Sequence, residues 1–161
     1  SPEIRYRQPR FLYWNVGGRF KDISASSGPA LKDVQSSRGS AVGDLDNDGA
    51  LEIVISNMGE RPSLLKNFGP RKNWLMVQCV GRSDIDAIGA RVRVQVAGRW
   101  LHAEVLGGSS YLSQSDPRLH FGLADSEAYQ AVEVRWPTGE REGFAGGTAN
   151  RLVVLKQGTG K

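Results

Sequence analysis

The sequence lacks the features that mark several common classes of protein. Its only cysteine is Cys79, so the chain cannot form a disulfide within itself. Cys79 lies in an apolar segment, which predicts a buried thiol. No apolar run approaches the roughly 20 residues that a membrane-spanning helix needs. The sequence therefore excludes an internally disulfide-bonded fold and gives no sign of a helical membrane span.

Helical periodicity is also missing. No segment repeats its apolar residues at the three- and four-residue spacing of an amphipathic helix. The 20 glycines among 161 residues exceed the average share of about 7%. Such a composition is typical of short strands joined by tight turns, so we predict an all-β fold.

The positive charge is not concentrated in the sequence. The net charge is +4, and the arginines are spread along the chain without forming a basic run. A nucleic-acid partner therefore has little support, and a solvated surface of mixed charge is expected.

One short stretch, by contrast, concentrates acidic residues at alternate positions. Three aspartates precede a glycine, and a glutamate follows shortly after. Without compensation these carboxylates would repel one another. Oxygen ligands on a flexible loop suit Ca²⁺, whereas Mg²⁺ and Mn²⁺ demand stricter octahedral geometry. We predict a calcium site formed by the side chains of Asp44, Asp46, Asp48 and Glu52 and the backbone carbonyl of Ala50.

This stretch, the carboxylate loop (residues 44–52), differs from an EF-hand. The twelfth position of an EF-hand carries a bidentate glutamate, and here that position is Ile55. The β-branched triplet Ile53-Val54-Ile55 follows the loop, which favours a strand over a helix. The loop is therefore predicted to connect two strands of a β-hairpin.

Residues 1–70 have the pattern of a repeat. Segments 12–17 and 64–69 both end an apolar run with Asn-x-Gly, and their asparagines, Asn15 and Asn67, are 52 residues apart. A period near 50 built from short strands indicates propeller blades. Such a fragment cannot close a propeller, so we expect it to pack on the remaining chain or to belong to a larger assembly.

Residues 68–73 contain glycine and proline and form the best candidate linker, which divides the chain into regions 1–70 and 71–161. The second region alternates apolar and polar residues in strand after strand, which predicts an antiparallel β-sandwich or barrel. Ala97-Gly98 is predicted to be a two-residue hairpin turn. The expected strands are 74–80, 90–96, 99–106, 111–114, 118–123, 131–136, 141–144 and 151–155.

Two segments of the chain resemble known families. Residues 43–54, Gly-Asp-Leu-Asp-Asn-Asp-Gly-Ala-Leu-Glu-Ile-Val, resemble the FG-GAP/VCBS repeat of calcium-binding β-propellers. Residues 73–136 resemble the ASPIC/UnbV domain that follows such repeats in cartilage-acidic-protein-like proteins. The motifs that carry the second resemblance are Asp86-Ala87-Ile88-Gly89-Ala90, Tyr111-Leu112-Ser113-Gln114, Leu119-His120-Phe121-Gly122-Leu123 and Val134-Arg135-Trp136-Pro137-Thr138-Gly139.

The resemblance implies a secreted or cell-envelope protein, calcium in the repeat loop, and a role in adhesion or recognition of an extracellular protein or carbohydrate. It implies no established reaction. The chain begins at Ser1 without a methionine or an apolar signal segment, so we expect a C-terminal fragment of a longer protein. The alternative is an accessory, carbohydrate-binding domain of a larger envelope enzyme.

Polar residues around the predicted strand 111–114 are candidates for a ligand surface, because loops on a rigid sandwich commonly carry recognition. A hydrogen-bonded turn that shapes the domain rim is the favoured alternative. The candidate ligand-surface residues are Tyr111, Gln114, Asp116 and Arg118.

Catalysis has little support from the sequence. A hydrolytic triad could only be assembled from His102, His120, Asp116 and nearby serines, and no nucleophile motif or zinc-binding histidine pair accompanies them. Trp100 and Trp136 lie among alternating valines and are expected to pack against the sheet. We therefore predict a protein that is not an enzyme.

Overall fold

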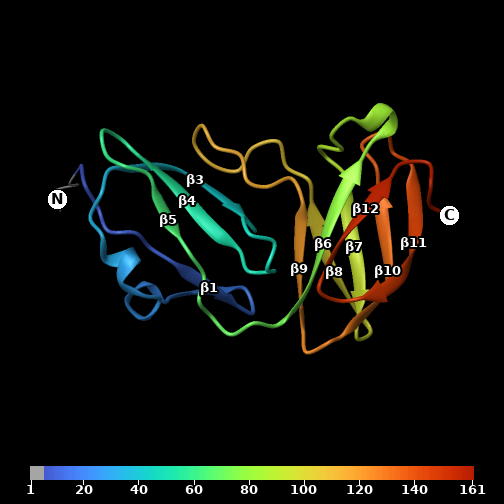
Figure 1. Cartoon of the computed structure of the whole chain (residues 1–161), viewed down its shortest axis with the longest axis horizontal. Helices are drawn as coiled ribbons and strands as arrows, with labels where there is room; N and C mark the ends of the chain where they lie inside the picture. Colours follow the sequence, from blue (N-terminus) through green and yellow to red (C-terminus); the bar gives the residue numbers. More distant parts are fainter. Residues whose placement is uncertain (1–5) are drawn as a thin grey trace.

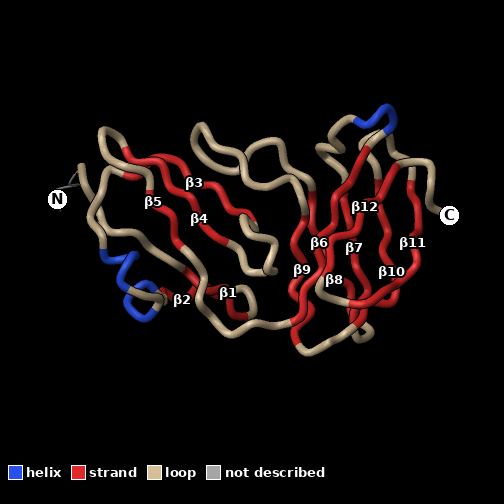
Figure 2. The backbone as a smooth tube through the Cα atoms, viewed as in Figure 1, coloured by secondary structure: helices blue, strands red, loops and turns tan. Residues whose placement is uncertain are grey.

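The computed structural model describes residues 6–161, and its regular structure is almost entirely β (Figures 1 and 2). Only short 3₁₀ turns interrupt the strands, at Ser24–Ser26, Pro29–Lys32 and Arg82–Asp84. The described residues include no helix that is long and apolar enough to cross a membrane. The predicted all-β fold class is confirmed.

The N-terminal region (residues 6–70) forms two small antiparallel sheets. One is the hairpin β1–β2, and the other has the strand order β3-β4-β5. The predicted hairpin on either side of the carboxylate loop is confirmed, because β3 ends at Gly43 and β4 begins at Glu52. The strands are β1 (Tyr13–Val16), β2 (Arg19–Asp22), β3 (Ser37–Gly43), β4 (Glu52–Asn57) and β5 (Ser63–Leu65).

A buried guanidinium joins parts of the N-terminal region. Arg10 is 8% exposed, and it donates to the Ala30 carbonyl at 2.9 Å and to Ser63 Oγ at 2.6 Å. It also donates to the side chain of Gln35. Few large apolar residues are buried in this region, so polar contacts carry much of its packing.

The C-terminal region (residues 71–161) has seven strands in two sheets, of order β12-β6-β9 and β11-β10-β7-β8. The valines of β7, predicted to face inward, are buried. The Ala97-Gly98 turn is confirmed, with φ of +48° and +74° as a tight β-hairpin requires. The strands are β6 (Asn73–Val80), β7 (Arg91–Val96), β8 (Arg99–Glu104), β9 (Leu119–Ala124), β10 (Ala128–Arg135), β11 (Arg141–Thr148) and β12 (Arg151–Lys156).

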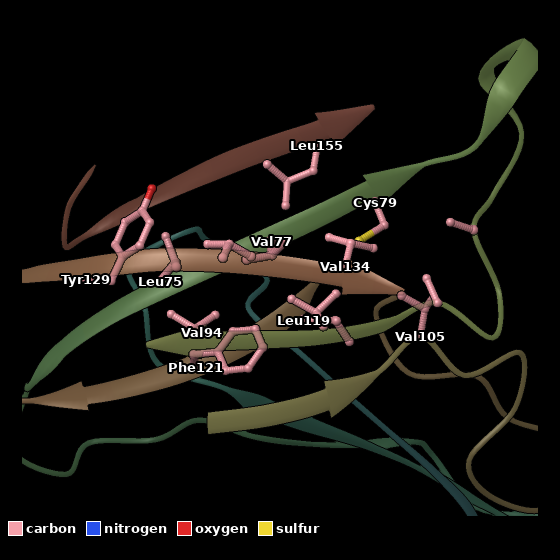
Figure 3. Packing of buried hydrophobic residues seen from close by; sticks show 14 of the residues in the cluster. Leu75, Val77, Cys79, Val94, Val105, Leu119, Phe121, Tyr129, Val134 and Leu155 are labelled. Atoms are coloured by element: carbon pink, nitrogen blue, oxygen red, sulfur yellow. The ribbon is translucent and has the colours of Figure 1, made fainter. Parts of the chain in front are cut away.

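The core of the C-terminal region lies between these two sheets (Figure 3). Leu75 and Val77 of β6 and Phe121 of β9 face Val94 of β7 and Val134 of β10. Trp136 is 1% exposed, as expected from its position beside the valines. The arrangement is a sandwich without closure into a barrel.

Two expectations about the C-terminal region were wrong. β12 pairs with β6 in parallel, because the chain crosses from one sheet to the other after β11. Alternating hydrophobicity places a strand in a sheet but does not fix the direction of its neighbour. Residues 111–114 form a turn and not a strand, because Leu112 has a left-handed backbone with φ of +48°.

The two regions contact each other through the long connection between β8 and β9, the β8–β9 loop (residues 105–118), which reaches toward β3 in Figure 1. The backbone N–H groups of Ser40 and Val42 in β3 donate to serine hydroxyls of the loop at 3.2 and 3.1 Å. The Asp116 N–H donates to the Val42 carbonyl at 2.9 Å. The free edge of β3 is thus covered, which removes an open strand edge from solvent.

Candidate metal centre

The carboxylate loop curls tightly between β3 and β4. Asn47 and Gly49 have φ of +58° and +86°, two left-handed positions that turn the chain back on itself. Asp44 is 1% exposed, and its two carboxylate oxygens accept the N–H groups of Asp48 at 3.1 Å and Gly49 at 2.8 Å. The buried carboxylate of Asp44 therefore organises the loop from its centre.

The structure brings the three predicted aspartate ligands together. Asp44, Asp46 and Asp48 each have a carboxylate oxygen within 4.8 Å of the other two. Calcium–oxygen distances are about 2.3–2.6 Å, so two ligands on opposite sides of one ion lie about 5 Å apart. Asp46 and Asp48 are exposed, so the cluster is open to solvent on one side.

Glu52 is buried next to the loop but lies outside the aspartate group. Its Oε2 accepts the Leu45 N–H at 3.1 Å. Its Oε1 is fully buried and has no hydrogen-bond partner among the described residues. A buried carboxylate oxygen without a partner is costly unless a positive charge compensates it.

Ala50, whose carbonyl is the fifth predicted ligand, is 6% exposed. Its N–H donates to Asp48 Oδ1 at 2.9 Å, so the chain turns around the Asp48 side chain before β4 begins. Ligation by this carbonyl remains a prediction.

Basic side chains compensate the two exposed aspartates. Lys66 Nζ lies 2.5 Å from Asp46 Oδ2, and Arg71 Nη2 lies 2.7 Å from Asp48 Oδ2. The hydrogen bond from Lys66 lowers the pKa of Asp46, and the same bond raises the pKa of Lys66. Lys66 and Arg71 therefore reduce the repulsion that the acidic spacing of the loop predicts. Both basic side chains are substantially exposed.

One side of the carboxylate loop contacts the C-terminal region. Arg118 donates from Nη1 to Asn47 Oδ1 at 2.7 Å and from Nη2 to the Asp44 carbonyl at 3.1 Å. His120 Nε2 donates to the Gly49 carbonyl at 2.9 Å, and its ring stacks on that of Trp74. Hydrogen bonds from Arg118 and from His120 of β9 therefore hold the carboxylate loop in place, and Trp74 of β6 packs against His120.

Asp116 orients Arg118 in this contact. Arg118 Nε donates to both oxygens of Asp116, at 3.0 and 2.8 Å. Burial alone would raise the pKa of Asp116, but the hydrogen bonds from Arg118 outweigh it and lower that pKa. Asp116 is thus held as a carboxylate that fixes the guanidinium against the loop.

The predicted ligand-surface residues are divided by the structure. Asp116 and Arg118 are directed at the carboxylate loop, whereas Tyr111 is 65% exposed and Gln114 is exposed on the β8–β9 loop. A ligand surface that includes Tyr111 and Gln114 remains a prediction.

The residues considered for a hydrolytic triad make other contacts in the structure. His120 contacts the carboxylate loop, and His102 lies opposite Arg93 on the outer face of the second sheet. Ser109 and Ser113 of the β8–β9 loop bond to Ser115 and to the Tyr111 carbonyl.

Four residues that contact the carboxylate loop were not predicted from the sequence to do so. They are Lys66, Arg71, Trp74 and His120. No local sequence signal indicates these contacts, because all four residues lie at least 14 positions from the carboxylate loop.

Comparison with known proteins points to one family. The family model described as ASPIC and UnbV matches residues 81–161. Human cartilage acidic protein 1 is 36% identical over 119 residues, which cover 70% of this chain and 18% of the relative. The mouse and Xenopus tropicalis proteins of the same name are 37% and 36% identical over 102 residues, 60% of this chain and 16% of each relative. The chain thus spans less than a fifth of the length of these relatives.

Proposed function

This chain belongs to the ASPIC and UnbV family, and from that premise we propose that it is a non-catalytic, calcium-binding module for adhesion or recognition outside the cell or in the cell envelope. The name of the curated relatives refers to cartilage, which supports an extracellular location. A recognition role agrees with a sandwich that presents long loops on a rigid core.

The observation that carries the calcium proposal is the set of oxygens in the carboxylate loop. Three aspartate oxygens within 4.8 Å of one another form an all-oxygen donor set, which suits a hard cation. The unpartnered, buried Oε1 of Glu52 is a second, independent sign of a missing positive charge. In this proposal Asp44, Asp46 and Asp48 bind the ion, and Glu52 and the Ala50 carbonyl complete the site.

We also propose that residues 1–70 are part of an FG-GAP/VCBS-like repeat array and that residues 71–161 form a separate ASPIC/UnbV domain. The N-terminal region exposes Phe20, Phe68 and Trp14 by 73, 86 and 59%. A groove of about 750 Å³ between the sheet β3-β4-β5 and residues 26–31 has an apolar lining that includes Leu64 and Phe68. A neighbouring repeat would cover this surface, as in other repeat proteins.

Calcium binding is tested by thermal unfolding of the chelator-treated chain with and without Ca²⁺. An ion that binds only the folded state at 100 times its Kd stabilises it by about 2.7 kcal/mol, and the melting temperature rises accordingly. We expect this gain for the wild type and its loss in Asp46→Ala. Mg²⁺ at the same concentration should give a smaller gain because of its stricter geometry.

Glu140→Ala is the matched control, since it removes one exposed carboxylate that pairs with Arg82 in the C-terminal region. This variant should keep the full gain in calcium. A wild-type melting temperature that does not respond to Ca²⁺ would refute the calcium proposal.

A further inference from the structure

The outer face of the sheet β11-β10-β7-β8 gathers arginines that are far apart in the sequence. Arg141 of β11 lies directly opposite Arg135 of β10, and Arg135 lies directly opposite Arg91 of β7. Adjacent strands are about 4.8 Å apart, so these three residues, the arginine row, span about 10 Å across the sheet. The even distribution of arginines along the sequence gave no indication of this row.

Only part of this positive charge is paired. Arg91 Nε donates to Glu104 Oε2 at 3.0 Å, at the end of the row. In the next row along the sheet, Arg93 donates to Glu133 Oε2 from Nε at 2.9 Å and from Nη2 at 2.5 Å. Within the described residues, Arg135 and Arg141 make no ion pair, so the face carries four arginines against two glutamates.

Like charges directly opposite one another on adjacent strands destabilise a sheet. In the arginine row, both neighbouring pairs are of this kind, and a single carboxylate stands at one end. An anion placed over Arg135 and Arg141 would remove this repulsion. The row therefore has the electrostatics of a binding site for oxyanion groups.

The face is also shaped for a ligand. A groove of about 410 Å³ is lined by Arg91, Arg93, His102, Glu133, Arg135 and Arg141, within the size range of small-molecule sites. The row beyond it consists of Ala145, Ala131, Gln95 and Trp100. The Arg93 guanidinium lies 4.4 Å over the Trp100 ring, which fixes its position.

We propose that the arginine row binds an acidic polysaccharide, whose carboxylate or sulfate groups pair with Arg135 and Arg141 while its chain lies in the groove. The row crosses the sheet at one end of its strands, and Arg135 and Arg91 lie on β10 and β7, which are paired on both sides. An extended acidic peptide binds best by adding a strand at a sheet edge, which this position does not offer. The proposal rests on the recognition role proposed above and is independent of the metal centre.

The test measures binding of heparin and of hyaluronan to the full chain by calorimetry in chelator, at about 0.05 M salt where screening is weak. Heparin carries sulfate and carboxylate groups, and hyaluronan carries carboxylates alone. We expect binding of at least one polysaccharide that weakens as salt increases. The double variant Arg135→Gln/Arg141→Gln should weaken it about tenfold, as expected when charged hydrogen bonds are lost.

The control is Arg99→Gln/Arg151→Gln, which removes the same charge at two exposed positions outside the row. It should retain wild-type affinity and the wild-type melting temperature, whereas Arg135→Gln/Arg141→Gln should melt at or slightly above that temperature because it removes the repulsion in the row. Equal losses in the two variants, or no binding of either polysaccharide, would overturn the proposal. Equally tight binding of poly-glutamate that also depends on Arg135 and Arg141 would assign the site to acidic peptides instead. Because chelator is present throughout, failure here leaves the calcium proposal untouched.

Discussion

At the scale of single residues, Gly49 joins the carboxylate loop to the C-terminal region. A Cβ at this position would lie 1.9 Å from Trp74 Nε1, and φ is +86°. Glycine is therefore needed for two reasons, the left-handed backbone and the close approach of the indole. The sequence suggested only the first of these, through the turn that the carboxylate loop requires.

Gly49→Ala should therefore destabilise the protein more than backbone strain alone explains. Gly59 is the matched control, since its φ is +67° and nothing lies within 4 Å of a Cβ there. Gly59→Ala should cost about 1–2 kcal/mol from the left-handed backbone. Gly49→Ala should cost a further 1–3 kcal/mol or so, because Trp74 must move. Urea unfolding in chelator gives both free energies, and equal costs would show that the Trp74 contact is unimportant.

Cys79 is a second residue whose environment makes a direct prediction. It is 7% exposed in the core of the C-terminal region, and burial raises its pKa from 9.0 to about 12. The native thiol should therefore stay protonated at pH 8–9 and react with iodoacetamide only when the region unfolds. The reaction rate with and without urea measures this, and rapid modification of the native chain would contradict the burial.

The raised pKa of Cys79 also has a consequence for stability. The contribution of the buried thiol to the free energy of unfolding is fully present below its ordinary pKa of 9.0. This contribution is lost as the pH rises from there to about 12. The unfolded chain releases the thiol proton first, so high pH favours unfolding.

At the scale of structural elements, the β8–β9 loop determines how the two regions meet. It covers the edge of β3 through Ser110, Ser115 and Asp116, and it presents Arg118 to the carboxylate loop. Residues 111–114 of this loop form a turn where a strand was predicted. The left-handed turn at Leu112 lets the loop lie along β3 instead.

Arg118→Gln should loosen the carboxylate loop without unfolding either sheet. It removes charged hydrogen bonds to Asn47, to the Asp44 carbonyl and to Asp116, each worth about 1.5–3 kcal/mol at most. We expect faster amide hydrogen exchange at Asp48 and Gly49, whose N–H groups bond to Asp44. Mass spectrometry of exchanged peptides would detect this change.

Arg82→Gln is the control for this prediction. It removes an exposed ion pair with Glu140 far from the carboxylate loop, worth about 0–1 kcal/mol. Exchange in the carboxylate loop should be unchanged in this variant. If Arg118→Gln also left that exchange unchanged, the contact between the regions would not support the loop.

At the scale of the whole molecule, the apolar core is unevenly distributed. The main buried cluster runs from Leu75 to Leu155 and lies wholly within the C-terminal region. The N-terminal region buries only three hydrophobic residues below 10% exposure, Leu31, Ala50 and Ile55. Stability should therefore come mainly from the sandwich.

A fragment of residues 71–161 should fold alone, and a fragment of residues 1–70 should not. The first keeps the complete core, and the second leaves most of its apolar side chains exposed. Near-ultraviolet circular dichroism and cooperative thermal unfolding would distinguish the two. Loss of cooperative unfolding in 71–161 would mean that the contact with the carboxylate loop is essential for the sandwich.

The sequence by itself determined the features that depend on neighbouring positions along the chain. A mostly apolar run predicted β6, and alternation predicted β7 and β10. The Ala97-Gly98 pair predicted its hairpin turn, and acidic spacing predicted the aspartate cluster. These signals are local, because strand faces and tight loops are defined by residues a few positions apart.

Only the tertiary structure decided the features that depend on the order and register of strands. It set β12 parallel to β6, placed Trp74, Arg118 and His120 behind the carboxylate loop, and aligned three distant arginines across one sheet. Hydrophobic patterning determines which face of a strand is buried, but it does not name the strand's neighbours. The contacts that join the two regions and the arginine row therefore appear only when the chain is folded.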